Sequence, residues 1–406
     1  MPCICKLSTR NCRDRNLAGA ASILALMLSG ATSPPLSAQS GSDQASDTAD
    51  RGGRRAKNGE RLFTTETFGG NGRTCQTCHS AQTGTVSPQD ARERLIKDYR
   101  DPLFLFDGSD DGKGNGFSRI LDEATILIEI PLPPTVRMGD DPKARSVVLA
   151  RGIPTTLNTP ALDTVLMLDG REPDLPTQAL HAIERHAQAK KRIPQPHLLR
   201  IAEFEKSDEF FSSPTLRSYA RGGPAPTLPF GRTMSEIRGR RFFIDAPLTG
   251  DNKTGACAVC HSGPMLNQTN RFLPLPVPAG TRFQTVNVSE RDVRNRKRPF
   301  IFTNADGTET TVWTPDPGRA LITGVIDGDP NAGGAPFFTS LNSFKIPTLW
   351  GVKNTAPYFH DNSAMNLEEL VDHYAEFVFA PLPPPFTTIF SQQDKADMVA
   401  YLKLLN

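Results

Sequence analysis

Two short stretches of the chain repeat the same arrangement of reactive side chains. Gly72–Ser80 reads GRTCQTCHS and Gly255–Gly263 reads GACAVCHSG, so each places two cysteines three positions apart and a histidine directly after them. This CxxCH spacing is typical of the covalent attachment of a c-type haem. The two thiols form thioethers with the porphyrin vinyl groups, and the histidine becomes an axial ligand of the iron.

Other uses of these cysteines explain less of the pattern. A zinc site needs four ligands that lie close together, whereas these pairs are far apart in the sequence and each has its own histidine. Disulfides would suit an exported protein, but each would close a very small loop and leave the histidines unexplained. We therefore predict two covalently bound haem c groups with iron ligands His79 and His261, attached through Cys75 and Cys78, and through Cys257 and Cys260.

Composition bounds the class of protein. The 406 residues carry a net charge of +2, from 46 basic and 44 acidic side chains. Such a balance gives no reason to expect nucleic acid or an anionic membrane surface as the main partner. The 35 prolines and 32 glycines predict a loop-rich fold with short helices.

The N-terminus has the pattern of a secretory signal. Basic residues precede the apolar stretch Leu17–Ala31, which is too short to span a bilayer comfortably, and LSAQ follows it. We predict a signal peptide over residues 1–38, export to the periplasm and no stable membrane insertion after cleavage. An uncleaved membrane anchor is the alternative. The polar residues 39–57 predict a disordered leader.

The two CxxCH motifs divide the chain into similar halves. Each motif follows a short amphipathic segment that ends in an apolar pair and a Gly/Asn-rich loop. This predicts duplicated cytochrome c-like haem domains over 58–225 and 232–406, joined by the Pro/Gly stretch 222–231. The fold class is mainly α with small β-hairpin insertions. We expect helices over 175–191, 194–205, 208–220, 367–377 and 392–405, and a hairpin over 300–313 around Asp306-Gly307.

Four ordered blocks resemble the bacterial di-haem cytochrome c peroxidase and MauG superfamily. They are GNGRTCQTCH, IPTTLNTPALDTVLMLDGREPDLPTQAL, CAVCHSGPMLN and FKIPTLWGVKNTAPYFHDNSAMNLEELVDHY. The resemblance runs from about Asn58 to the C-terminus. It implies two haems with unequal roles near a domain interface, one relaying electrons and one meeting hydrogen peroxide. It also implies a small redox donor protein of the cytochrome c or cupredoxin type.

The resemblance assigns a ligand to the second haem. Members carry a sixth ligand fourteen residues after the histidine of PYFH: methionine in the peroxidases and tyrosine in the MauG type. Fourteen residues after His360 stands Tyr374, and a phenolate would lower the reduction potential of that haem. The alternatives are Met365, His373 or no sixth ligand. The resemblance makes His360 itself a hydrogen-bonding residue beside this haem.

The first haem is expected to be the reactive one. No histidine occurs between His79 and His181, so we expect an open iron position where peroxide or oxygen binds. Peroxide cleavage needs a base, and the family's glutamate position holds Gln188, while Gln178 matches a family glutamine. On a helix, His181 and Glu184 would share a face with Gln188, so either of them could act as the base in place of the family's glutamate. Alternatively, these side chains lie on an exposed helix face and have no catalytic role.

A second departure concerns electron exchange. The family's aromatic residue between the haems is replaced by Leu168. Electrons must then pass between the haems directly or through another group. Trp313 and Trp350 are the two tryptophans in the sequence.

Two further features of the sequence allow more than one interpretation. Family members bind calcium between their domains, and Thr355 and Pro357 match carbonyl donors there, but Gly152 stands in place of the expected asparagine. The basic run Arg294–Arg298 could dock an acidic redox partner or be a solvated loop.

Three functions are compatible with these expectations. The first is a periplasmic di-haem peroxidase, and the second is a MauG-like enzyme that oxidises an organic or protein substrate. The third is an electron-transfer cytochrome without turnover. Two six-coordinate, low-spin haems would favour the third, and one accessible high-spin haem would favour the first two.

Overall fold

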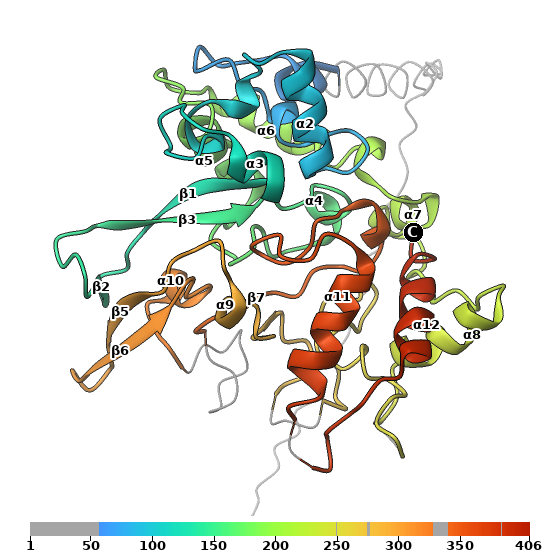
Figure 1. Ribbon diagram of the computed structural model, residues 1–406. Coiled ribbons are helices and arrows are strands. Elements are labelled where there is room, and N and C mark those ends of the chain that lie inside the picture. The colour runs from blue at the N-terminus through green and yellow to red at the C-terminus, as the bar shows by residue number, and fades with distance from the viewer. Residues whose placement is uncertain (1–56, 249, 274–276, 328–339, 383) are drawn as a thin grey trace, which may run out of the picture. The chain divides into compact units, whose positions relative to one another are not determined.

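The computed structural model describes residues 57–248, 250–273, 277–327, 340–382 and 384–406. Within these residues helices make up most of the regular secondary structure and accompany small antiparallel sheets (Figure 1), as the predicted class requires. The predicted signal peptide and residues 39–56 of the predicted leader lie outside this part of the chain. In the described part, no helix has the length and apolar character needed to cross a membrane.

Short helices surround the first CxxCH motif. A helix over 57–64 precedes it, and the motif itself starts a 3-10 turn, η1 (Cys75–Thr77). The next helix, α2, begins where Ser87 and Asp90 cap each other's backbone and Pro88 occupies the first turn. The elements after the motif are α2 (Pro88–Lys97), η2 (Pro102–Phe104), η3 (Phe106–Gly108) and α3 (Ser118–Glu123).

The helix α5 (Leu175–Arg185) is shorter than predicted. It begins where the Asp174 side chain accepts a hydrogen bond from the Thr177 amide. It ends at Arg185, and Gln188 takes a left-handed backbone with φ of 55°. The predicted helical face shared by His181, Glu184 and Gln188 is therefore wrong, because Gln188 lies beyond the helix.

The remaining helices lie close to their predicted positions. The predicted segment 208–220 splits into a 3-10 turn and a helix, and the predicted helix 367–377 continues as a π-helix from Tyr374. The bounds are α4 (Thr159–Leu162), α6 (Gln195–Phe204), η4 (Asp208–Phe210), α7 (Pro214–Ala220), α8 (Met234–Arg240), η5 (Arg241–Phe243), α9 (Val288–Arg291), α10 (Ala320–Thr323), η6 (Val352–Asn354), α11 (Leu367–His373), η7 (Tyr374–Phe379) and α12 (Gln392–Leu402).

A two-stranded sheet that the sequence analysis missed connects the first haem motif to the centre of the fold. Strands β1 (Thr125–Pro131) and β3 (Ser146–Gly152) pair antiparallel, with Thr125 opposite Gly152. Inward residues of β1 alternate with more exposed ones, as expected for a strand with one face on the core.

The predicted hairpin is confirmed and gains a third strand. Strands β5 (Arg298–Thr303) and β6 (Glu309–Thr314) pair antiparallel around Asp306-Gly307. On its other edge, β5 pairs with β2 (Val136–Met138), from the other half of the sequence (Figure 1). A third small sheet joins β4 (Phe283–Gln284) to β7 (Phe344–Lys345).

Buried apolar side chains form several clusters. One lies beside the first CxxCH motif and includes Leu62, Phe63, Ile183 and Phe204. A second lies under the second motif and includes Phe242, Trp350 and Tyr401. A third combines residues from both halves, among them Ile126, Ile128, Met138, Leu149, Phe300 and Phe302. The division into domains 58–225 and 232–406 stays a prediction.

Candidate haem-binding active site

The two CxxCH loops have the same local geometry. The amide of His79 donates to the carbonyl of Cys75 at 3.1 Å, and that of His261 donates to Cys257 at 2.9 Å. In each loop the histidine Nδ1 lies against a carbonyl five residues on, at 2.7 Å from Gly84 and 2.8 Å from Leu266. A carbonyl only accepts, so Nδ1 carries the proton in both rings. This leaves Nε2 as the metal-binding atom, in the arrangement typical of metal-ligating histidines.

The four cysteines of these loops are free thiols. The alternative of internal disulfides is therefore not realised in this structure. Burial raises the thiol pKa of all four side chains, to about 12 for Cys257 and Cys260. All four are protonated at neutral pH, the form in which a thiol adds across a vinyl group. Each motif thus keeps the groups that covalent haem attachment needs.

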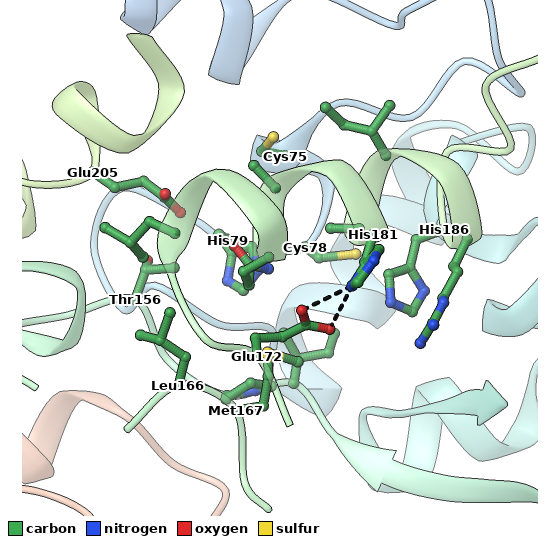
Figure 2. Close-up of a pocket in the computed structure, with 18 of the residues that line it drawn as sticks. Cys75, Cys78, His79, Thr156, Leu166, Met167, Glu172, His181, His186 and Glu205 are labelled. Atoms are coloured by element: carbon green, nitrogen blue, oxygen red, sulfur yellow. Dashed lines mark hydrogen bonds and ion pairs between the residues drawn. The ribbon is translucent and has the colours of Figure 1, made fainter. Parts of the chain in front are cut away.

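A large cavity opens beside the first motif. It has about 1420 Å³ of empty space, part of it open to solvent, and Cys75, Cys78 and His79 line it (Figure 2). Haem is a large, flat and mostly apolar ring, and the cavity offers it a mostly apolar wall. The apolar lining comes from several elements and includes Phe63, Ile126, Ile128, Ile153, Leu166, Leu168, Leu175 and Ile201. The lining therefore fits a haem attached at Cys75 and Cys78.

The helix α5 forms the polar wall of this cavity. Gln178 and His181, two of the candidates from the sequence analysis, both line it. His181 Nδ1 lies 2.8 and 3.0 Å from the two carboxylate oxygens of Glu172, and Glu172 is buried (Figure 2). The carboxylate fixes Nδ1 as the protonated nitrogen and leaves Nε2 free to accept a proton.

The other two candidates from this segment lie elsewhere. Glu184 is exposed and is not among the cavity-lining residues. Gln188 does not line the cavity either, and its Oε1 accepts a hydrogen bond from Asn71 at 3.2 Å. Of the two groups that could replace the missing glutamate, the structure brings only His181 to the cavity wall. Its role as a base stays a prediction.

A second histidine of the cavity wall belongs to a buried charge network that sequence reasoning missed. His186 Nδ1 lies 2.6 Å from Asp107, whose other oxygen pairs with the buried Arg73. Arg73 also donates to the carbonyls of Pro102 and Leu103. Burial would raise the pKa of Asp107, but the hydrogen bond from His186 and the charge of Arg73 lower it below its usual value. The network ties the first CxxCH motif to the end of α5.

Glu205, at the end of α6, is a third cavity residue without a sequence signal. Its side chain is buried, and its Oε2 has no hydrogen-bond partner. Burial raises the pKa of this carboxyl to about 8, because a buried carboxylate loses its hydration. At neutral pH the group is therefore a neutral acid on the wall of the cavity (Figure 2).

Glu205 makes stability depend on pH in a definite direction. Between about 4.5, the ordinary value, and about 8, the folded state holds a proton that the unfolded state has lost. The free energy of unfolding should therefore fall as pH rises through this window. Glu205→Gln should remove that fall and be more stable than the parent at pH 8, as measured by urea unfolding at several pH values. The matched control is the exposed Glu203→Gln, which should keep the parent's slope; equal slopes in all three proteins would contradict the assignment.

The second motif has an aromatic neighbour at the position that the resemblance assigned. Tyr374 packs against the cluster that holds Phe242 and Trp350, together with Cys257. Burial raises the pKa of its phenol, and the nearby Cys260 and Cys257 add to this. A phenol in this place would ionise only if a cation such as an iron centre held it.

Of the alternatives to Tyr374, His373 is the one whose ring nitrogens are already engaged in other contacts. Both ring nitrogens of His373 are engaged, Nε2 with the carbonyl of Val286 at 2.7 Å and Nδ1 with Arg291 at 2.8 Å. Met365 donates its backbone amide to Glu369 at 2.7 Å. Ligation of the second haem by Tyr374 stays a prediction. Both ring nitrogens of His373 are bonded to other residues.

His360 is buried in a charged layer. Its ring stacks on Phe344 at 4.0 Å between centroids. Its Nε2 lies 3.4 Å from a carboxylate oxygen of Asp292 and 3.8 Å from one of Asp316. Asp316 in turn pairs with the buried Arg151. Hydrogen bonding by His360 to a haem stays a prediction, since these contacts are with carboxylates.

The side chain of Asn362 fills the space beside Gly152, the position where the family has an asparagine. A Cβ atom at Gly152 would lie 2.2 Å from Oδ1 of Asn362, so no asparagine side chain could occupy position 152 beside it. Asn362 itself donates to the carbonyls of Glu123 and Ala124. Within the described residues, no group of three or more His, Cys, Asp or Glu side chains could hold a metal ion. Binding of calcium stays a prediction.

Most of the basic run Arg294–Arg298 is already paired. Arg294 lies 3.0 Å from Glu123, while Arg296 and Arg298 both pair with Asp140. This supports the reading of the run as part of the fold's own surface network.

Comparisons with known proteins find sequence similarity to one curated protein and structural similarity to several solved structures. No family model matches the chain. It is 25% identical over 265 residues to the cytochrome c551 peroxidase of Nitrosomonas europaea, an alignment that covers 62% of this chain and 64% of the relative. The chain therefore matches less than two thirds of the length of this curated relative.

Two solved structures are also similar. One is a MauG-like protein associated with microbial copper homeostasis, with 19% identity, a TM-score of 0.47 and coverage of 87% of this chain and 88% of the other. The other is the di-haem peroxidase BthA from Burkholderia thailandensis, with 16% identity, a TM-score of 0.46 and coverage of 87% and 86%.

The sequence match agrees with the four blocks and the paired haem motifs. Both CxxCH loops keep their thiols free and their histidines oriented alike. In sequence the chain is similar to a cytochrome c551 peroxidase, in agreement with the family that the four blocks resemble.

Proposed function

We propose that the protein is an exported, periplasmic di-haem c-type oxidoreductase that reduces hydrogen peroxide. A large cavity with a mostly apolar lining, whose wall includes both a CxxCH motif and the paired His181 and Glu172, is the observation that carries this proposal. Cys75, Cys78 and His79 would hold the haem of this cavity, and Cys257, Cys260 and His261 would hold a second one. Haem iron, when bound, supplies the redox chemistry that the side chains lack.

The side chains of the cavity handle the protons. Reduction of one peroxide to two waters takes up two electrons and two protons. Nε2 of His181 would accept the proton of the inner peroxide oxygen and return it to the outer oxygen as the O–O bond breaks. Glu172 would orient the ring and stabilise its protonated form. Most of the remaining accessible wall is apolar, but charged residues such as Arg171 and Lys345 also line the cavity.

The electrons would come from a small donor protein of the cytochrome c or cupredoxin type through the second haem. The test is steady-state peroxide consumption by the purified protein with a reduced small cytochrome and, separately, a reduced cupredoxin. One peroxide should disappear for every two donor molecules oxidised. Electron paramagnetic resonance of the oxidised protein should show one high-spin haem. Two low-spin haems without peroxide consumption would favour a plain electron-transfer cytochrome.

A MauG-like oxidase of an organic or protein substrate is the second candidate. The placement of Tyr374 beside Cys257 and Cys260 favours it, as does Leu168 on the cavity wall where the peroxidases have an aromatic residue. A phenolate ligand would lower the potential of the second haem and suit it to oxidising chemistry.

Tyr374→Phe should separate these two candidates. The change removes the phenol oxygen and keeps the ring that packs in the cluster. If Tyr374 ligates the second haem, its reduction potential should rise, and a tyrosinate-to-iron charge-transfer band should disappear. Spectroelectrochemistry of parent and variant measures both. The control is Tyr219→Phe, a change at another tyrosine that packs against the same cluster. An unchanged spectrum and potential in Tyr374→Phe would exclude ligation by this residue.

A further inference from the structure

A continuous chain of bonds connects the two haem-ligating histidines through the interior of the protein. Its first part starts at His79, whose Nδ1 donates to the carbonyl of Gly84 at 2.7 Å. The same carbonyl accepts the amide of Thr156 at 3.1 Å. Thr156 lines the cavity of the first motif (Figure 2) and leads along the backbone to Asn158.

The second part of the chain runs through Trp350. The side-chain amide of Asn158 donates to the carbonyl of Trp350 at 2.9 Å, and the indole Nε1 donates to the carbonyl of Pro264 at 2.8 Å. Pro264 lies two residues before Leu266, whose carbonyl accepts Nδ1 of His261 at 2.8 Å. Both ends of the chain are therefore the second nitrogen of a ligating imidazole.

Two glycines allow the close approaches on this path. Gly84, with φ of 66°, would place a Cβ atom 2.7 Å from the amide nitrogen of Thr156. Gly351, with φ of 79°, would place one 2.9 Å from Leu157 and 3.2 Å from Nδ2 of Asn158. A side chain at Gly84 would push the bridging segment away from the first haem loop, and one at Gly351 would push it away from the segment that carries Trp350. The bridging segment 156–158 thus lies close to both.

The bridging residues are buried and fixed. Asn158 is 1% exposed and Trp350 is 5% exposed. The orientation of the Asn158 amide is set by Ser212, which accepts from Nδ2 at 2.9 Å and donates its backbone amide to Oδ1 at 2.8 Å. A buried chain of covalent and hydrogen bonds is a physical route for coupling between two sites.

We propose that this chain, and the Asn158–Trp350 link above all, carries the electron exchanged between the two haems. The inference rests on the proposed function, since it requires haem at both motifs. One electron leaves the group held at His261, which is oxidised, and reaches the group held at His79, which is reduced. No proton moves and no bond is made or broken. Trp350 would thereby conduct the electron between the haems in place of the aromatic residue that Leu168 replaces. An aliphatic side chain offers neither a π-system nor a hydrogen bond for this transfer.

Trp350→Phe tests the route in the haem-loaded protein. The variant keeps an aromatic ring in the cluster but loses the indole donor to Pro264. Carbon monoxide is bound to the protein reduced by one electron and is released by a laser flash, and the redistribution of the electron between the haems is followed optically. We expect this step to be several-fold slower in Trp350→Phe. Both reduction potentials and the midpoint of thermal unfolding are measured alongside, so that a change of driving force or of fold is recognised.

The matched control is Trp313→Phe, at an exposed residue of β6, which should redistribute the electron as fast as the parent. Asn158→Asp is a second test, because an ionised carboxylate keeps the size of the amide but cannot donate to Trp350; it should slow the step as well. An unchanged rate in both path variants would overturn the route and leave direct exchange. A parent protein with fewer than two haems in a pyridine haemochrome assay would instead contradict the proposed function.

Discussion

Replacement of Cys75 and Cys78 by serine is expected to leave one covalently attached haem per chain and to abolish peroxide consumption. Serine hydroxyls do not form thioethers with the porphyrin vinyl groups, and the cavity beside α5 would lose its anchored group. Haem staining of denaturing gels, pyridine haemochrome quantification and a peroxide assay measure the three consequences.

The matched variant carries serine at Cys257 and Cys260. It should also keep one haem, now the one at His79, and this haem should still bind cyanide. Its turnover with a donor protein should be lost, because the relay is missing. If haem is removed from the parent protein by acid acetone, or if either double variant keeps two haems, covalent attachment at these residues is contradicted.

His181→Ala is expected to slow the reaction with peroxide by about 10²–10⁴-fold, the usual contribution of a general base. His181 reaches the cavity wall and has its Nδ1 held by Glu172, so its removal leaves no imidazole in that place. Stopped-flow mixing with hydrogen peroxide gives the rate. Cyanide affinity and haem content should change little, since the residue is not proposed as an iron ligand.

Three further variants define the role of this pair. Glu172→Gln should slow the reaction less than His181→Ala, because the amide still accepts from Nδ1 but stabilises the protonated ring poorly. His197→Ala, on α6, is the control and should react like the parent. Glu184→Gln addresses the exposed alternative, and a large loss there with none in His181→Ala would reverse the assignment.

The features that the sequence predicted well depend on local interactions. In each CxxCH loop the amide and Nδ1 of the histidine bond to residues at most five positions away, so the orientation of the histidine follows from local interactions. The hairpin around Asp306-Gly307 is equally local, as is the start of α5 at its Asp174 cap. These elements could be placed without any knowledge of the rest of the chain.

The features that sequence reasoning missed depend on distant partners. The end of α5 is fixed by His186, which bonds Asp107 from a distant part of the chain. The periodicity of apolar residues along the helix cannot predict that contact. Glu172 is recognisable as a partner of His181 only once the turn before α5 is known. Strand β1 pairs with β3, and its inner face packs in a cluster that includes residues more than 150 positions away. Nothing in the sequence distinguishes Glu205 from the other acidic residues, because its special property is its burial in the folded protein.

The three-stranded sheet that joins β2 to β5 and β6 has a consequence for how the polypeptide responds to cleavage. Residues of β2 and β5 come from opposite sides of the Pro/Gly stretch 222–231, yet Met138, Phe300 and Phe302 are fully or almost fully buried together. Either fragment alone would expose these side chains and an unpaired strand edge. A protease that cuts within 222–231 should therefore yield a nicked, non-covalent complex that elutes as one species, and the two fragments should recover their folds only when they are renatured together.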